Sequence, residues 1–158
     1  MNPSPSSPNA PFFVDLEVLR LTKNGIWMSD DTEITHEPTR KLFSRSLVRD
    51  GGGYSLKVGR ESKRVEVEDT AYFVTQIDGT PRTGVRVRLS DETEEALDPA
   101  TLSYRPGRLT CRIKKGQEEA KFLHAAYFEF LKDLEEDNHA YFLSFGKTRI
   151  ELSKRSAP

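Results

Sequence analysis

The fold is decided by residues 24–58, NGIWMSDDTEITHEPTRKLFSRSLVRDGGGYSLKV. Asn24-Gly25 predicts a tight hairpin turn, because both residues readily adopt the positive φ angles that such a turn needs. Residues 36–49 then predict a helix with one apolar stripe, preceded by a capping threonine. Gly51–Gly53 end that helix, and a strand follows. The order of elements is therefore hairpin, helix, hairpin.

A similar order returns near the end of the chain. Pro106-Gly107 predicts a turn between two strand-like runs, residues 116–137 predict the clearest helix in the sequence, and Gly146-Lys147 predicts a final hairpin turn. Between the two copies, residues 71–89 predict a middle hairpin. The predicted fold class is α+β, with two similar halves that each combine a small antiparallel sheet with one helix.

The expected domain boundaries follow from this repeat. Residues 1–11 contain four of the nine prolines and are expected to form a disordered tail. Residues 12–80 form an N-terminal α+β half, residues 81–153 a C-terminal α+β half, and residues 154–158 a second tail. A groove between the two halves is the expected place for a ligand.

Composition limits the class of protein. Charged residues make up 31% of the 158 positions and hydrophobic residues 35%, and no apolar run approaches the roughly 20 residues that span a bilayer. The N-terminus lacks the features of a signal peptide, and the single cysteine cannot form an internal disulfide. These features predict a cytoplasmic protein that does not bind membranes. The net charge of −1 gives the chain no overall attraction to nucleic acids or to anionic membranes.

Two glycine stretches resemble parts of a phosphate-binding loop. Gly51–Gly53 follow a predicted helix, whereas a phosphate loop precedes one, so a left-handed helix cap explains them better. Gly146-Lys147-Thr148 lacks the glycine five positions earlier, where Tyr141 stands, and a strand follows it. Both stretches therefore predict turns, and no nucleotide cofactor is expected.

Few residues suggest catalysis. The histidines, His36, His124 and His139, lie at no metal-ligand spacing with one another or with Cys111, so no metal site is expected. Cys111 alternates with apolar residues and is predicted to face the core. The sequence leans against an enzyme and identifies no catalytic residue. An alternative keeps His36 or His124 as an acid–base residue with a carboxylate partner.

Basic residues gather on two predicted strands. Arg86 and Arg88 lie opposite an apolar face, and Arg112 lies opposite Leu109 and Cys111. If these two strands pair, they form a cationic sheet face that could contact the phosphates of a nucleic acid. The simpler interpretation is a solvated face neutralised by nearby acids, including those of the acidic connector at residues 91–95.

The chain also resembles a bacterial family called domain of unknown function 1285 (DUF1285). The resemblance rests on the Asn24–Trp27 turn, on Arg49 through Tyr54, on Arg64 through Asp69, and more loosely on residues 144–146. It covers roughly residues 16–152. It departs at residues 57–63, which keep only a glutamate and a lysine of the family's usual segment. The resemblance implies two similar α+β halves, no established activity, and a role in signalling or regulation.

The leading functional hypothesis is a non-enzymatic binding or regulatory module that recognises a small acidic ligand or a protein partner. Nucleic-acid binding through the basic sheet face and an enzyme are the alternatives. An open sheet edge could support a homodimer. The predicted ligand-contacting residues are Trp27, Lys63, Arg64, Arg86, Arg88 and Arg112.

Overall fold

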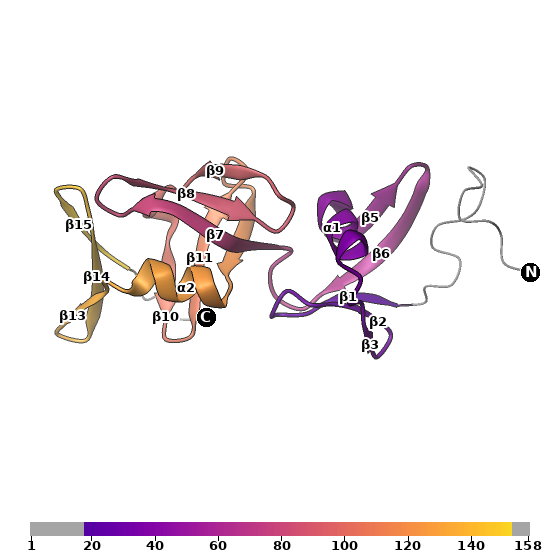
Figure 1. Ribbon diagram of the computed structural model, residues 1–158, viewed down its shortest axis with the longest axis horizontal. Helices are drawn as coiled ribbons and strands as arrows, with labels where there is room; N and C mark the ends of the chain where they lie inside the picture. Colours follow the sequence, from indigo (N-terminus) through magenta and orange to yellow (C-terminus); the bar gives the residue numbers. More distant parts are fainter. Residues whose placement is uncertain (1–17, 153–158) are drawn as a thin grey trace, which may run out of the picture. The chain divides into compact units, whose positions relative to one another are not determined.

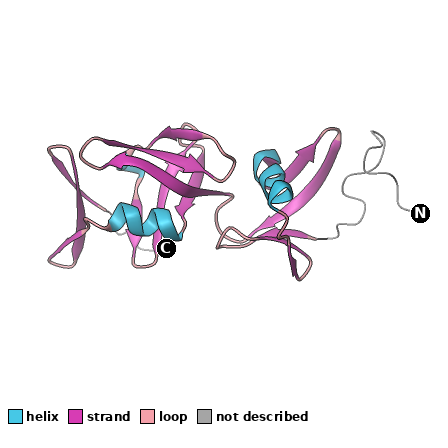
Figure 2. Ribbon diagram, viewed as in Figure 1, coloured by secondary structure: helices cyan, strands magenta, loops and turns pink. Residues whose placement is uncertain are grey.

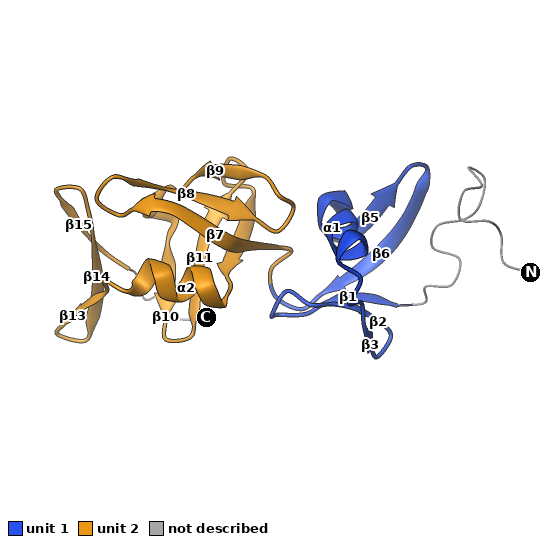
Figure 3. Ribbon diagram, viewed as in Figure 1, with its two compact units in different colours: residues 1–69 blue, residues 70–158 orange. Residues whose placement is uncertain are grey.

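A computed structural model describes residues 18–152, so the predicted tails at residues 1–11 and 154–158 lie outside the described residues. The chain divides into two compact units, Met1–Asp69 and Thr70–Pro158 (Figure 3). The sequence placed this boundary after residue 80. That position lies at the end of a strand, Tyr72–Thr80, which pairs with Gly84–Leu89 in one hairpin, and a boundary there would divide the hairpin.

Within residues 18–69, the first unit has six strands and one helix. Its sheet has the order β3-β2-β1-β6-β5-β4, and every neighbouring pair is antiparallel except β1 and β6 (Figure 1). The elements are β1 Leu19–Leu21, β2 Trp27–Ser29, β3 Thr32–Glu33, α1 Glu37–Ser46, β4 Leu47–Asp50, β5 Gly53–Val58 and β6 Glu61–Val67.

Within residues 70–152, the second unit has a six-stranded sheet, a short 3₁₀ turn, one α-helix and a three-stranded sheet (Figure 2). The sheet orders are β10-β11-β12-β7-β8-β9 and β13-β14-β15, and the one parallel pair is β12 with β7. The elements are β7 Tyr72–Thr80, β8 Gly84–Leu89, β9 Glu94–Ala96, η1 Pro99–Thr101, β10 Ser103–Arg105, β11 Arg108–Ile113, β12 Glu118–Phe122, α2 His124–Leu131, β13 Glu135–Asp137, β14 Ala140–Phe145 and β15 Thr148–Glu151.

The two six-stranded sheets have the same topology. Each consists of two consecutive three-stranded antiparallel meanders, and in each the first strand pairs in parallel with the sixth. A helical element, α1 or η1, connects the third strand to the fourth. The prediction of an α+β fold with two similar halves is therefore confirmed. The repeated element differs from the expected one, because α1 corresponds to η1 rather than to α2.

Residues 123–152, which carry α2 and β13–β15, are an addition to the second sheet. Among the described residues, the first unit has no counterpart of this segment. The sequence pattern matched α2 with α1 because both are amphipathic helices followed by hairpins. The strand pairing, which defines the true repeat, involves residues far apart in sequence and is not visible in local periodicity.

The core of the first unit forms where α1 packs on the sheet. Trp27 and Phe43 meet edge to face with ring centroids 5.4 Å apart, and each is at most 2% exposed. The Trp27 indole N–H donates a hydrogen bond to the hydroxyl of Ser44 at 3.1 Å. This bond satisfies the one polar group of the buried indole.

Cys111 lies in the core of the second unit, as its alternation with apolar residues predicts. Its side chain is 1% exposed, and burial together with the charges of Glu95 and Glu119 raises its pKa to about 12. The thiol is thus protonated at neutral pH and is shielded from solvent. Other core residues of this sheet, on β8, β11 and β12, are Val85, Val87, Leu89, Leu109, Ile113 and Ala120.

The first predicted helix is shorter than residues 36–49. It ends at Ser46, and Leu47 continues in extended conformation as the first residue of β4, opposite Leu56. The glycines are consequently not a helix cap. Gly51 and Gly52, with φ angles of 57° and 83°, form the turn between β4 and β5. The prediction of left-handed glycines was right, but the element that they terminate is a strand.

The second predicted helix is also shorter than residues 116–137. Residues 118–122 form β12, in which Glu118, Ala120 and Phe122 are buried and the residues between them are partly exposed. This strand pairs with β11 on one side and β7 on the other. Its hydrogen bonds to two neighbours outweigh the helical preference of a short Glu- and Ala-rich sequence.

Lys114 joins the β11–β12 turn to the loop between β8 and β9. Its ammonium group donates to Asp91 at 2.8 Å and lies 5.1 Å from the centroid of the Tyr72 ring. Burial opposes ionisation of Asp91, but hydrogen bonds from Lys114 and Thr93 outweigh this effect and lower the pKa of its carboxyl group. The Lys114–Asp91 ion pair is therefore expected to stabilise the second unit.

Replacing Lys114 by Met tests this ion pair. We expect the free energy of unfolding to fall by about 1–2 kcal/mol, because Asp91 would stay half-buried without its partner. The folded pKa of Asp91 lies below its usual 3.8. The stability that the ion pair contributes is therefore fully present above that pH, and it is lost as the pH falls through the folded pKa. Urea titrations at pH 7 and at a series of acidic pH values measure both effects. Lys115→Met, at the exposed neighbouring position, is the control, and an equal loss there would contradict the prediction.

Candidate functional site

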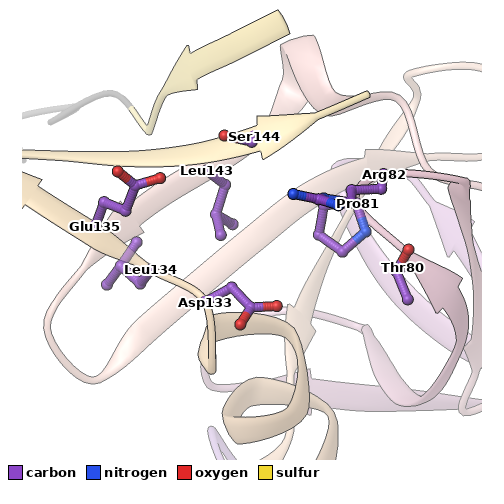
Figure 4. A pocket seen from close by; sticks show the side chains of 8 residues that line it. All are labelled: Thr80, Pro81, Arg82, Asp133, Leu134, Glu135, Leu143 and Ser144. Atoms are coloured by element: carbon purple, nitrogen blue, oxygen red, sulfur yellow. The ribbon is translucent and has the colours of Figure 1, made fainter. Parts of the chain in front are cut away.

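The second unit contains a cavity of about 520 Å³. One wall is the turn between β7 and β8, and the other wall comes from the segment that follows α2 and from β14 (Figure 4). The cavity therefore lies between the repeated sheet and the added segment. Its lining residues are Thr80, Pro81, Arg82, Asp133, Leu134, Glu135, Leu143 and Ser144.

Aromatic contacts hold β14 in position beside the larger sheet. The rings of Tyr104 on β10 and Tyr141 on β14 meet edge to face at 5.0 Å, and Phe130 of α2 lies 6.1 Å from Phe145. Burial and a hydrogen bond with Tyr127 raise the pKa of Tyr104 to about 12, so its phenol stays neutral. These contacts place one wall of the cavity.

A backbone hydrogen bond ties the two walls together at one end. The N–H of Gly146, in the turn between β14 and β15, donates to the carbonyl oxygen of Pro81 at 3.1 Å. Gly146 has a φ angle of 60°, and a β-carbon there would lie 3.6 Å from the carbonyl oxygen of Arg82. Gly146-Lys147 thus forms a hairpin turn, as the sequence predicts, and this turn contacts the β7–β8 turn.

The cavity combines charged groups with an apolar floor. Leu143 is fully buried and Leu134 partly so, whereas Arg82, Asp133 and Glu135 are exposed. Figure 4 shows Glu135 and Arg82 on opposite sides of Leu143. The Thr80 and Ser144 side chains add hydroxyl groups. This arrangement can hold a molecule that carries charges of both signs beside an apolar group.

None of the lining residues was among the predicted contact residues. The turn-forming sequence of residues 78–84 was recognised, but only as a hairpin connection. Asp133 and Glu135 were assigned to the end of a long helix. Because the cavity joins residues more than 50 positions apart, no local pattern could have indicated it.

The predicted contact residues of the first unit lie in different environments. Trp27 is 2% exposed and belongs to the core. Lys63 pairs in register with Leu56 on the face that packs against α1, whereas Arg64 is the next residue of the same strand and points to the opposite face. The Arg64 guanidinium donates to the carbonyl oxygen of Asp50 at 2.6 Å and lies over Gly53. Lys63 and Arg64 therefore do not share a surface.

The two basic strands of the second unit do not pair, so the condition for a cationic sheet face is not met. β12 and β7 lie between β11 and β8 in the sheet, so Arg112 is separated from Arg86 and Arg88 by two strands. The Arg112 guanidinium donates to the carbonyl oxygen of Gly116 at 2.8 and 3.2 Å and stabilises its own hairpin turn. A continuous cationic face made of these paired strands is thus absent.

The arginines of β8 face acidic neighbours. Arg86 lies opposite Asp78 of β7, and Arg88 lies opposite Glu94 of β9 in the acidic connector. The alternation of exposed arginines with buried Val85 and Val87 agrees with the sequence pattern. This arrangement favours the interpretation of β8 as a solvated face whose arginines are neutralised by nearby acids, rather than as a phosphate-binding surface.

None of the three histidines is among the residues that line the cavity. His36 precedes α1, and its Nδ1 lies 2.7 Å from the hydroxyl of Thr39. His124 begins α2 and stacks on Phe128 with centroids 6.5 Å apart. His139 lies in the turn between β13 and β14 with a φ angle of 66°. Within residues 18–152, no group of three His, Cys, Asp or Glu residues could hold a metal ion, and no helix is long and apolar enough to cross a bilayer.

Comparison with known proteins identifies the fold. The sequence matches no protein-family model and no curated protein. A solved DUF1285 family protein from Silicibacter pomeroyi DSS-3 matches over 87% of this chain and 81% of its own, with a TM-score of 0.64 and 13% identity. A second, from Shewanella baltica OS155, matches over 75% and 93%, with a TM-score of 0.56 and 21% identity. The chain therefore has the fold of the DUF1285 family proteins, in agreement with its resemblance to that family.

Proposed function

We propose that this chain is a binding or regulatory module, related to the DUF1285 proteins, that holds a small polar ligand or peptide in the cavity beside Arg82. One observation carries the proposal: the cavity places a guanidinium and two carboxylates around a leucine floor. Its volume of about 520 Å³ falls within the range of roughly 300–1,000 Å³ that is typical of small-molecule sites. The binding site is then this cavity and not a groove between the two halves.

The position of the cavity supports a regulatory role. It lies where the added segment meets the β7–β8 turn, and a backbone hydrogen bond from the N–H of Gly146 to the carbonyl oxygen of Pro81 joins these parts. A ligand that contacts Arg82 on one wall and Asp133 on the other would bind the two parts together. The family resemblance suggests a role in signalling, and the single cysteine suggests the cytoplasm. In such a role, the signal would be the tighter contact between the added segment and the β7–β8 turn when the ligand is bound.

Thermal melting of the full chain tests the proposal. We expect one compound from a panel of amino acids, short peptides, nucleotides and phosphosugars to raise the melting temperature. A ligand at 100 times its dissociation constant stabilises by about 2.7 kcal/mol. Ser144→Leu, which places a larger side chain in the cavity, should abolish the shift.

A matched substitution controls for general effects on the fold. Ser62→Leu lies on an exposed strand position of the first unit and should leave the ligand-induced shift unchanged. A shift that survives Ser144→Leu, or a panel without any hit, would argue against the cavity as a binding site.

A further inference from the structure

We propose that the ligand of this cavity is a zwitterion, a free amino acid or short peptide whose ammonium group faces Asp133 and Glu135 and whose carboxylate faces Arg82. The inference rests on the proposed function and adds the chemical class of the ligand. It is argued from the signs, positions and surroundings of the charged residues that line the cavity.

The charges of the lining favour a ligand that carries both signs. Arg82 contributes one positive charge, and Asp133 and Glu135 contribute two negative charges. A purely anionic ligand, such as a phosphosugar, would pair with Arg82 but would be repelled by both carboxylates. A simple cation would leave the guanidinium without a counter-charge. A ligand with both signs satisfies each wall.

The charged groups are also on opposite walls. Arg82 lies in the β7–β8 turn, whereas Asp133 and Glu135 flank Leu134 in the segment that leads from α2 into β13. Figure 4 shows Glu135 and Arg82 on either side of Leu143. A zwitterion bound across Leu143 would therefore place its two ends at groups of opposite charge. An arginine fork suits a carboxylate because it can donate two parallel hydrogen bonds.

The ion pair between Glu135 and Arg149 is weak enough to leave the Glu135 carboxylate accessible to a ligand. The Arg149 guanidinium lies 3.9 Å from Glu135 and also 3.9 Å from Asp137, so both ion pairs are long and shared. Exposed pairs of this kind contribute little to stability. A ligand ammonium could approach Glu135 without breaking a strong bond.

The leucines of the cavity floor indicate what uncharged group the ligand carries. Leu143 is fully buried and Leu134 is half-buried, and both line the cavity. An aliphatic side chain placed on Leu134 would bury apolar surface on both molecules, whereas Leu143, which is already inaccessible to water, would add packing contacts alone. Leucine and leucyl-leucine are consequently suitable probes, and comparing them distinguishes a free amino acid from a peptide.

Isothermal titration of the full chain with blocked and unblocked probes tests the inference. Leucine or leucyl-leucine should bind about tenfold or more tightly than the N-acetylated and the C-amidated forms, because each blocked form loses one charge-assisted contact. Arg82→Gln should remove the preference for a free carboxylate, and Asp133→Asn the preference for a free amine. Arg60→Gln, in the exposed β5–β6 turn, should change neither preference.

The possible failures are distinguishable. If blocked and unblocked probes bind equally, or if only compounds that are not zwitterions bind and Ser144→Leu abolishes their binding, the zwitterion inference is wrong and the cavity remains a binding site. If the preferences appear but persist in Arg82→Gln and Asp133→Asn, the residues are wrongly assigned. If binding of every compound survives Ser144→Leu, both proposals fail.

Discussion

Replacing Trp27 by Ala is expected to lower the free energy of unfolding by about 3–5 kcal/mol, the usual loss when a large buried aromatic side chain is truncated. The indole is 2% exposed, packs edge to face on Phe43, and donates its N–H to Ser44. The substitution would remove a large part of the apolar contact between α1 and the sheet. Urea unfolding followed by circular dichroism measures the effect, because the chain has no other tryptophan for fluorescence.

Two milder variants separate packing from hydrogen bonding. Ser44→Ala keeps the indole but leaves its N–H without this acceptor, and we expect a loss of about 1–2 kcal/mol. Ile26→Ala, at the partly exposed neighbouring position, should change stability by less than about 1 kcal/mol. A small effect of Trp27→Ala, accompanied by weaker ligand binding, would instead favour the sequence-based prediction that Trp27 contacts a ligand.

Replacing Gly79 by Ala is expected to cost about 3–4 kcal/mol, because two unfavourable effects coincide. The residue has a φ angle of 83°, and a β-carbon at this position would overlap the carbonyl oxygen of Gly84 across the hairpin. Since backbone atoms cannot move aside as a flexible side chain can, the end of the β7–β8 hairpin must shift. Thermal unfolding measured by calorimetry reports the loss.

Gly84→Ala provides the matched control on the opposite strand. Its φ angle of 105° strains any side chain, but a β-carbon there meets no atom within 4 Å. We expect a smaller loss of about 1–2 kcal/mol, which reflects strain alone. Because Thr80, Pro81 and Arg82 line the cavity, Gly79→Ala should also weaken ligand binding more than Gly84→Ala does. Equal losses in stability would show that the overlap is relieved without cost.

Much of the local structure follows from the sequence. The turns at Asn24-Gly25, Pro106-Gly107 and Gly146-Lys147 were predicted from residues that favour positive φ or turn geometry, and each connects two antiparallel strands. The burial of Cys111 and the exposure of Arg86 and Arg88 follow from period-two alternation. These properties depend on residues close together in the chain, so a single sequence is enough to predict them.

Strand pairing and helix length were harder to predict from the sequence. Both helices were predicted to be longer than they are, because Leu47 and the residues around Ala120 are compatible with a helix. In the structure both positions lie in strands, and each pairs with the other strand of a hairpin. Whether the two basic strands pair could likewise not be decided from the sequence, and the structure separates them by two strands. Alternation tells which face of a strand is buried, but not which strand lies next to it.

The sequence by itself determined the α+β class, the positions of several turns and the buried face of the strands that it identified, since these arise from backbone preferences and from hydrophobic alternation. Only the tertiary structure decided that the repeated unit is a pair of three-stranded meanders and that residues 123–152 are added to the second one. It also decided that Arg82 lies across from Asp133 and Glu135. The physical reason is that long-range strand pairing and packing depend on the whole chain at once, whereas local preference acts within a few residues.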